Sequence, residues 1–365
     1  MIGALLAVVS VLTACGRGGG AGGREPPVPG GAAAAADPVE IPSVPAVRIA
    51  GDVLWDLDDG DFLFPRFSPD GSTLAFASSI VRDEVEGTEV FLLDLATGKR
   101  RPLLKADEAA AIGVYKAFVG DLEWSDRSVL WVDVLDGDVG VTRLTYDTRR
   151  GEVIGRIHTE ADEFEDPPLP SELEPAVPRV AALLPDLNSS QVRAAMGAFG
   201  AVVEDEGAIL DPSGSGSDVR LVDFRRGVTI PLQGWPSDAG QLLGGGFIHD
   251  GGAVYSIAGR DEARVYVHQG GTTREVARFT AKCSYLRAAG GGPGTPAFFV
   301  LRTEAANVHG DNPFLMYDRG RIARIEDYAG LADADVDGRA SVVAYSRWEG
   351  DERHIAVRRL RVPGP

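Results

Sequence analysis

Side chains that could carry out catalysis are few and widely separated in this sequence. A serine nucleophile of the α/β-hydrolase type lies in a Gly-x-Ser-x-Gly turn, and the sequence contains no such pattern. Zinc sites of the His-Glu-x-x-His type need two histidines one helical turn apart. The five histidines are instead isolated from one another: His158, His249, His268, His309 and His354. We therefore predict no catalytic residue, no metal site and no cofactor.

Two acidic stretches have the carboxylate density of weak calcium sites. Residues 333–338, with the sequence Asp-Ala-Asp-Val-Asp-Gly, match the first half of an EF-hand loop. Ala344 stands at the twelfth position, however, where a bidentate glutamate would bind the ion. Four aspartates form a second acidic turn: Asp56, Asp58, Asp59 and Asp61. Plain turns explain both stretches, and a weak calcium site stays open as an alternative at either.

Cys15 is the residue with the clearest chemical context. It follows an apolar run, Ile2 to Leu12, which is too short to span a bilayer and has the length of a signal-peptide core. Residues 12–15, Leu-Thr-Ala-Cys, resemble the bacterial lipobox. The resemblance implies a signal peptide over 1–14, cleavage before Cys15, and acylation of its thiol with palmitate-like chains that anchor the protein to a membrane. An ordinary secretory signal cut elsewhere is the alternative, and no Lys or Arg precedes Ile2.

The segment after Cys15 has the composition of a disordered tether. It is rich in Gly, Ala and Pro and contains almost no large apolar residue, so it cannot bury enough surface to offset its ordering entropy. We expect a lipidated Cys15 and a tether over 15–46, followed by one folded domain over 47–365. Cys283 is the only other cysteine. With Cys15 acylated, we expect Cys283 to be a buried thiol without a disulfide partner.

Charge narrows the set of partners. The chain has 365 residues and a formal net charge of −18, which repels phosphate backbones. We therefore predict no nucleic-acid partner. Residues 158–178 hold many Asp and Glu interleaved with prolines, which predicts a solvated insertion loop, with a docking peptide for a basic partner as the alternative.

A hairpin signature lies near the start of the folded domain. Ser68-Pro69-Asp70-Gly71 combines a proline that sets φ, an aspartate that can bond to the backbone, and a glycine that tolerates positive φ. Strand-like runs flank it, and a second hairpin follows from Glu89 to Leu104. The result is a four-stranded meander of about forty residues, the size of one propeller blade.

Five further units with the same layout follow along the chain. Their clearest ranges are Val119 to Ile157, Phe199 to Leu232, Gln241 to Phe279, Cys283 to Ile325 and Leu331 to Val362. The third unit is the least regular, because residues 189–196 fit a short helix or a strand. The sixth has only three strands, so we expect the spare segment Val44 to Leu57 to return to it as the outermost strand and close the ring.

Residues 67–76, Phe-Ser-Pro-Asp-Gly-Ser-Thr-Leu-Ala-Phe, resemble the repeat of TolB-like β-propellers of the bacterial envelope. The resemblance covers roughly Val47 to Val362 and is sharp only in the first unit. It implies an all-β fold, a six-bladed β-propeller, and protein partners in the cell envelope. The extra N-terminal α/β domain of TolB is absent from this sequence, which leaves a role in the Tol system in doubt.

These observations lead to one functional prediction and two rivals. We predict a monomeric, non-enzymatic, lipid-anchored lipoprotein outside the cytoplasm, whose propeller binds a protein partner or serves as a scaffold. One rival is a propeller hydrolase or lyase with channel-lining His, Asp or Glu. The other is a carbohydrate or small-ligand binder with exposed aromatic rings, for which Trp124, Trp235 and Trp348 are candidates. We expect most of these tryptophans to pack between blades instead.

Overall fold

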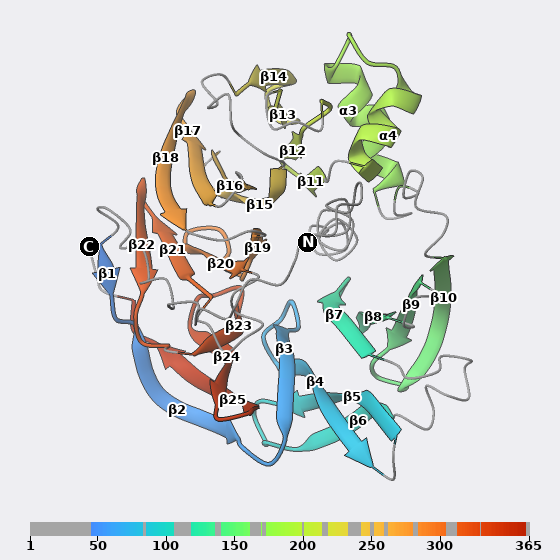
Figure 1. Cartoon of the computed structure of the whole chain (residues 1–365), viewed down its shortest axis with the longest axis vertical. Helices are drawn as coiled ribbons and strands as arrows, with labels where there is room; N and C mark the ends of the chain where they lie inside the picture. Colours follow the sequence, from blue (N-terminus) through green and yellow to red (C-terminus); the bar gives the residue numbers. More distant parts are fainter. Residues whose placement is uncertain are drawn as a thin grey trace, which may run out of the picture.

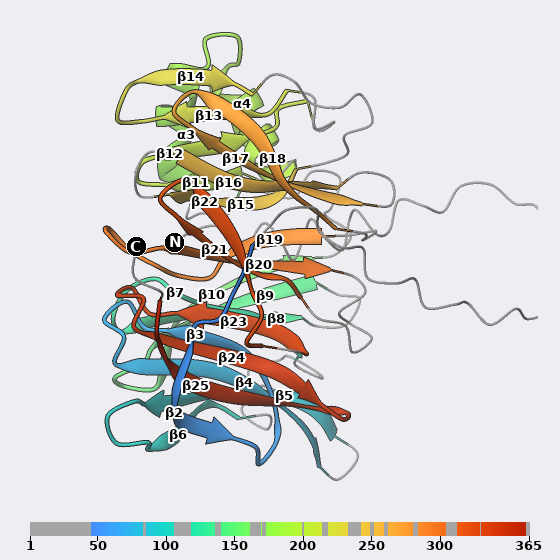
Figure 2. The same cartoon turned by 90° about the vertical axis from the view of Figure 1, so that its left-hand side faces the viewer.

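The computed structural model describes residues 45–82, 85–105, 118–135, 140–160, 169, 173–198, 201–213, 218–232, 242–248, 252–258, 262–279, 284–303, 312–328 and 330–362. Cys15, Cys283, Trp235, His249 and His309 lie outside these ranges. In the described part, β-sheets stand radially around a central axis (Figure 1), and the view at a right angle shows their strands running across the thickness of the ring (Figure 2). None of the helices described is both long and apolar enough to cross a bilayer.

The described strands form six four-stranded antiparallel groups, which we number as blades 1 to 6 in chain order. Blade 1 holds β3 (Asp61–Phe67), β4 (Thr73–Arg82), β5 (Val85–Asp94) and β6 (Arg100–Leu104). Blade 2 holds β7 (Phe118–Trp124), β8 (Val129–Leu135), β9 (Gly140–Asp147) and β10 (Glu152–Glu160). Blade 3 holds β11 (Ala201–Glu204), β12 (Gly207–Leu210), β13 (Arg220–Asp223) and β14 (Val228–Pro231).

The remaining three blades follow the same plan. Blade 4 holds β15 (Leu242–Ile248), β16 (Gly252–Ala258), β17 (Ala263–Gln269) and β18 (Thr272–Phe279). Blade 5 holds β19 (Ser284–Ala288), β20 (Ala297–Thr303), β21 (Phe314–Asp318) and β22 (Arg321–Ile325). Blade 6 holds β23 (Leu331–Val336), β24 (Val342–Glu349), β25 (Glu352–Leu360) and β2 (Ala50–Leu57). The predicted all-β propeller fold is confirmed.

The turn that first indicated the fold is built as its residue types require. The Asp70 carboxylate accepts bonds from the hydroxyls of Ser68 and Ser72, both at 2.8 Å. Gly71 has φ of +69°, a conformation that glycine adopts without steric cost. Its amide donates to the Ser68 carbonyl at 2.8 Å, which closes the turn between β3 and β4.

Shared hydrophobic clusters hold most neighbouring blades together. Apolar side chains of adjacent sheets pack between blades 1 and 2, 3 and 4, 4 and 5, 5 and 6, and 6 and 1. Blades 4 and 5 are also joined by a short parallel pairing of their innermost strands, β15 and β19. The innermost strands are therefore fixed on both sides over most of the ring, which gives the axis a rigid wall.

Blade 3 carries helices that sequence patterns resolved only in part. The alternative of a helix for residues 189–196 is right, because α4 spans Ser189–Ala198. The acidic insertion loop is shorter than expected, since β10 continues to Glu160 and α3 (Val177–Leu183) begins before Pro178. Both helices pack on the blade 3 sheet through buried residues that include Val180 and Met196.

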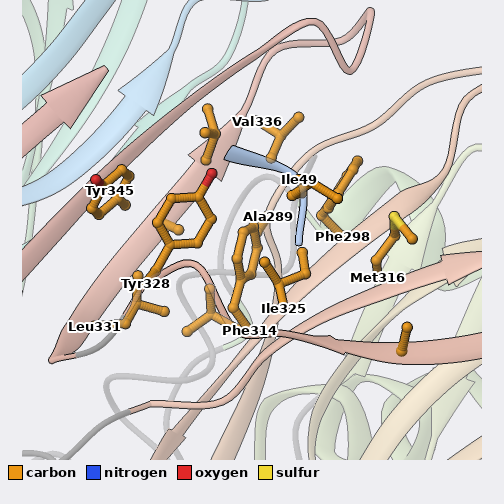
Figure 3. Packing of buried hydrophobic residues seen from close by; sticks show 14 of the residues in the cluster. Ile49, Ala289, Phe298, Phe314, Met316, Ile325, Tyr328, Leu331, Val336 and Tyr345 are labelled. Carbon is orange, nitrogen blue, oxygen red and sulfur yellow. The ribbon is translucent and has the colours of Figure 1, made fainter. Parts of the chain in front are cut away.

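The N-terminal segment closes the ring, as predicted. β2 pairs antiparallel with β25 and completes blade 6. Two residues earlier, β1 (Ala46–Val47) pairs parallel with β22 on the outer edge of blade 5, which the sequence did not indicate. Between the two strands Ile49, only 1% exposed, inserts among Phe298, Phe314 and neighbouring residues of the core that joins blades 5 and 6 (Figure 3). The segment therefore clasps two blades.

Candidate functional site

The innermost strands place charged side chains along the axis of the ring. In β23, Asp333 and Asp335 are two residues apart and so lie on one face of the strand. Ala334 and Val336, on the opposite face, belong to the hydrophobic core between blades 5 and 6. Alternation in a single strand thus anchors one face in the core and places two carboxylates on the other face, of which Asp335 lines the axial cavity.

Asp333 is the centre of a buried ion network that joins three blades. Its carboxylate accepts hydrogen bonds from Arg66 Nη1 of blade 1 at 2.7 Å, and from Arg287 Nη2 and Arg302 Nη2 of blade 5 at 2.9 and 2.7 Å. The residue is 3% exposed. Charge-assisted bonds from several guanidinium groups are among the stronger polar contacts in proteins, so this hub ties the first blade to the last two.

Arg66 extends the network to blade 2. Its Nη2 donates to Asp121 at 2.5 Å, and its Nε donates to the Leu122 carbonyl at 3.0 Å. The carbonyl of Pro65 accepts the remaining bond from Nη1 at 2.8 Å. In return, the indole N–H of Trp124 donates to the Arg66 carbonyl at 3.0 Å. The expectation that Trp124 packs between blades is confirmed.

The network fixes the charge state of its members. Burial alone would raise the pKa of Asp333, but Arg287, Arg302 and Arg66 outweigh burial and hold this pKa well below its usual value. Burial likewise opposes the charge of Arg66, whereas Asp121, Asp333 and Asp335 raise the pKa of its guanidinium. Asp333 and Arg66 are therefore both charged across the physiological pH range.

A cavity of about 460 Å³ lies beside this network, within the size range of small-molecule sites. Most residues that line it belong to the innermost strand of each blade or to the turn that follows it, and three belong to β20 of blade 5. One representative from each blade, in order, is Arg66, Glu123, Glu204, Phe247, Arg287 and Asp335. The cavity therefore lies on the axis, where the six blades converge.

Two carboxyl groups on the cavity wall titrate far from their usual pKa. Burial raises the pKa of Glu123 to about 8, against the opposing pull of Arg143. Burial also raises the pKa of Asp335 to about 6, although Arg287 and Arg66 act in the other direction. Perturbed carboxyl groups of this kind concentrate at functional sites. Both line the cavity, whereas Asp333 lies behind its wall.

The rest of the wall is largely apolar. Rings of Trp124, Phe247, Tyr285 and Phe299 contribute to it, together with the glycine run 290–292.

Gly290 has φ of +101° and forms a bridge with Val336, and a side chain at this position would overlap the Val336 carbonyl. The run thus needs glycine to bring the backbone of blade 5 close to blade 6.

The three histidines in the described ranges lie far apart, each in a different blade. His158 contacts Thr142 in blade 2, His268 contacts Thr273 in blade 4, and His354 contacts Glu349 in blade 6. Over the described ranges, no three or more His, Cys, Asp or Glu side chains are grouped to hold a metal ion.

The two acidic stretches are used for structure. Asp59 forms a bidentate contact with Arg100 at 2.9 and 2.8 Å, and Asp61 contacts Arg353 at 2.7 and 2.6 Å. Within 333–338, the first two aspartates belong to strand β23, and Asp337 accepts a bond from the Ser341 amide at 2.7 Å in the following turn. The turn expected at Asp337-Gly338 is confirmed.

Sequence reasoning did not find the channel network. Arg66 appeared only as part of the turn motif, and Asp333 and Asp335 only as part of a calcium-like stretch. One feature of the sequence could have indicated the network. Charged residues recur in the first strand of several blades, among residues that are mostly apolar. Arg66, Asp121, Glu123, Arg287, Asp333 and Asp335 share this position.

The radial sheets, their meander order and the axial cavity define the protein as a β-propeller. No protein-family model matches the sequence, and no curated protein matches it either. Solved structures match at low similarity. The β-propeller domain of the Trilobed protease from Pyrococcus furiosus is 15% identical, with a TM-score of 0.36, over 83% of this chain and 80% of that one.

Two other solved structures match at a similar level. TolB from Acinetobacter baumannii is 11% identical with a TM-score of 0.36, and the match covers 84% of this chain and 64% of that chain. AofleA from Arthrobotrys oligospora is 9% identical with a TM-score of 0.43, over 87% of both chains.

Proposed function

We propose that this protein is a lipid-anchored binding protein of the bacterial cell envelope, exposed outside the cytoplasm, whose propeller binds a protein partner or serves as a scaffold. The observation that carries the proposal is the path of the N-terminal segment 45–57, which pairs with blade 5 through β1 and with blade 6 through β2. Pro45 and β1 lie at the outer edge of blade 5, because the Pro45 carbonyl accepts a bond from the Arg324 amide of the outermost strand. A chain that enters the ring at its rim suits a protein tethered through its N-terminal segment.

The lipobox-like residues before Cys15 and the TolB-like sequence of residues 67–76 support the envelope location. The membrane is either the cell membrane, on its outer face, or the outer membrane, on its periplasmic face. The protein acts there as a monomer and without catalysis. Its channel arginines are already engaged by buried aspartates, which suits a rigid binding surface.

The test is a comparison of the intact lipoprotein with a Cys15→Ser variant. Mass spectrometry should find acyl chains on Cys15, and fractionation should place the wild type with membranes and the variant in the soluble fraction. Proximity labelling should then identify the same envelope protein with the wild type in repeated experiments and lose it with the variant. An unmodified Cys15 would contradict the anchor, and reproducible labelling of cytoplasmic proteins alone would contradict the location.

A hydrolase or lyase with its site in the channel is the second candidate. The observation that favours it is the pair Glu123 and Asp335, whose pKa values of about 8 and 6 suit a general acid and a general base. Turnover of peptide, ester or glycoside probes that is lost in both Glu123→Gln and Asp335→Asn would establish this candidate. Turnover that persists in both variants would come from elsewhere.

A further inference from the structure

Arg287 has one hydrogen-bond donor without an acceptor. The residue lies on β19, is 6% exposed and lines the axial cavity. Its Nη1 donates to the Ala288 carbonyl at 2.8 Å, and its Nη2 donates to Asp333 at 2.9 Å and to the Ala334 carbonyl. Its Nε has no acceptor among the described residues. A buried donor without an acceptor is costly, so a group that brings an acceptor to this position would gain affinity.

The direction of this donor is fixed by the bonds of its neighbours. Both terminal nitrogens of Arg287 are held by acceptors, one in blade 5 and two in blade 6. A guanidinium group is planar, so holding its two terminal nitrogens also fixes the direction of the Nε–H bond. Arg287 cannot turn this donor toward another wall atom without breaking those bonds, and an acceptor has to come to it.

Two of the charged residues on the cavity wall already have counter-charges. Arg66 is paired with Asp121 at 2.5 Å and with Asp333 at 2.7 Å. Glu206 is paired with Arg225 at 2.5 Å. Neither residue needs an ion from solution to balance its charge.

The other carboxyl groups on the wall leave no free charge either. Asp335 accepts a bond from the Phe67 amide at 2.8 Å and lies 3.9 Å from Arg287 Nη1. Glu204 has an interaction partner of its own. Burial raises the pKa of Glu123 to about 8, so this group is largely protonated at pH 7. An ion in the cavity would lose its hydration without gaining a counter-charge, and the wall therefore favours a neutral ligand.

Aromatic rings form much of the remaining wall. Tyr285 lies two residues before Arg287 on β19, and therefore on the same face of the strand. Trp124, Phe247 and Phe299 also line the cavity. Aromatic side chains pack well against flat apolar rings. A ligand that combines such a ring with one oxygen acceptor matches both the apolar wall and the unpaired donor.

From this arrangement we propose that the axial cavity binds a small neutral carbonyl compound, whose oxygen accepts a hydrogen bond from Arg287 Nε and whose apolar ring packs among the aromatic side chains of the wall. Aryl ketones and tertiary amides are the ligand class. Their carbonyl oxygen is a neutral acceptor that, unlike a hydroxyl group, brings no donor of its own. This site goes beyond the proposed envelope role and does not depend on lipidation or on a protein partner.

Three probes with the same skeleton separate the effects of oxygen and charge. Acetophenone carries the carbonyl, α-methylstyrene has a methylene group in place of the oxygen, and benzoate has the same shape with a negative charge. Equilibrium dialysis of the full chain against the same detergent solution measures binding and corrects for partition into micelles. Burial alone would favour α-methylstyrene, the most apolar probe. We expect acetophenone instead to bind about 3- to 10-fold more tightly than α-methylstyrene and at least about 10-fold more tightly than benzoate.

Arg287→Lys tests the donor itself. The change keeps a positive charge beside Asp333 and removes the Nε–H group, so the preference for acetophenone over α-methylstyrene should disappear. Arg302→Lys is the matched control, because Arg302 also donates to Asp333, at 2.7 Å, but lies outside the cavity lining. The control should keep the preference. Denaturant unfolding verifies that both variants are folded.

A second variant leaves the ion network intact. Ala288 is exposed and lines the cavity, so Ala288→Leu places additional side-chain atoms there without removing a hydrogen bond. This change should weaken acetophenone binding about 10-fold. Ala182→Leu is its control, because Ala182 is exposed on α3 and outside the cavity lining, and it should leave binding unchanged.

The outcomes are distinct. Tighter binding of acetophenone than of both other probes, weakened by Ala288→Leu and not by Ala182→Leu, supports the proposal even if Arg287→Lys does not fold. Equal or tighter binding of α-methylstyrene or benzoate, no binding at millimolar concentration, or a preference that persists in folded Arg287→Lys overturns it. Unchanged affinity in Ala288→Leu also overturns it. None of these results depends on whether Cys15 is acylated, so failure here is separate from failure of the envelope proposal.

Discussion

Arg66 Nη1 and Asp333 Oδ2 lie 2.7 Å apart, although 267 positions separate the two residues in the sequence. The bond connects the innermost strand of the first blade with that of the last blade. The same carboxylate also holds Arg287 and Arg302. At the axis, ion pairs therefore connect the first blade with the last. At the rim, strand pairing and the buried side chain of Ile49 fasten the N-terminal segment to blades 5 and 6.

Replacing Asp333 by Asn should strongly destabilise the fold. The change leaves buried guanidinium groups without their shared counter-charge, for which a loss of about 3–5 kcal/mol in unfolding free energy is expected. Denaturant unfolding measures the loss. Asp59→Asn is the control, because its partner Arg100 and Asp59 itself are both largely exposed, and it should cost less than about 1 kcal/mol. Equal effects of the two substitutions would argue against a special role of the hub.

Acid should weaken the ring through the same residue. The pKa of Asp333 is lowered in the folded state from an ordinary value of 3.8. Its stabilising contribution is thus complete above pH about 4 and is lost as the pH falls toward the depressed folded pKa. Unfolding free energy measured from pH 5 to pH 2 should fall more steeply for the wild type than for Asp333→Asn. Parallel curves would contradict the assignment.

Asp335 should have the opposite dependence. Burial raises its pKa from 3.8 to about 6, so the folded state favours the protonated form. That preference lowers stability as the pH rises from about 4 through 6, by up to about 3 kcal/mol. Asp335→Asn keeps an oxygen for the Phe67 amide, which donates to Asp335 at 2.8 Å, and removes the charge. The variant should be more stable than the wild type at pH 8 and show no such gain at pH 4.

The parts of the structure that sequence patterns revealed are those fixed by nearby residues. Turn chemistry at Ser68 to Gly71 and the apolar strand runs depend on neighbours within a few positions, and both are as expected. The incomplete sixth unit indicated the closing strand β2, because an open sheet edge needs a partner. The channel network depends on strands of four blades, 1, 2, 5 and 6, meeting near one axis. No local pattern states which charges of different blades will meet there, so the Asp333 hub was missed.

The turn between β3 and β4 permits a narrow substitution test. Gly71 has φ of +69°, and a side chain there would meet only ordinary contacts with Asp337. Gly71→Ala should therefore cost about 1 kcal/mol through backbone strain alone, and Gly71→Asn should cost less, because asparagine tolerates positive φ. Thermal unfolding of the two variants compares them. A larger loss with Asn than with Ala would mean that side-chain contacts, rather than φ, limit this position.

The clasp at the rim should respond to a single core substitution. Ile49 is 1% exposed between blades 5 and 6, and its carbonyl accepts a bond from the Arg361 amide at 3.0 Å. Ile49→Ala should cost about 2–5 kcal/mol, because it leaves a cavity where β1 and β2 meet. Limited proteolysis should then cut the N-terminal segment before the rest of the ring. Val53→Ala on the same segment is the control: Val53 is 51% exposed, so its truncation should change neither stability nor the cleavage pattern. Resistance of Ile49→Ala equal to that of this control would mean that strand pairing alone fastens the ring.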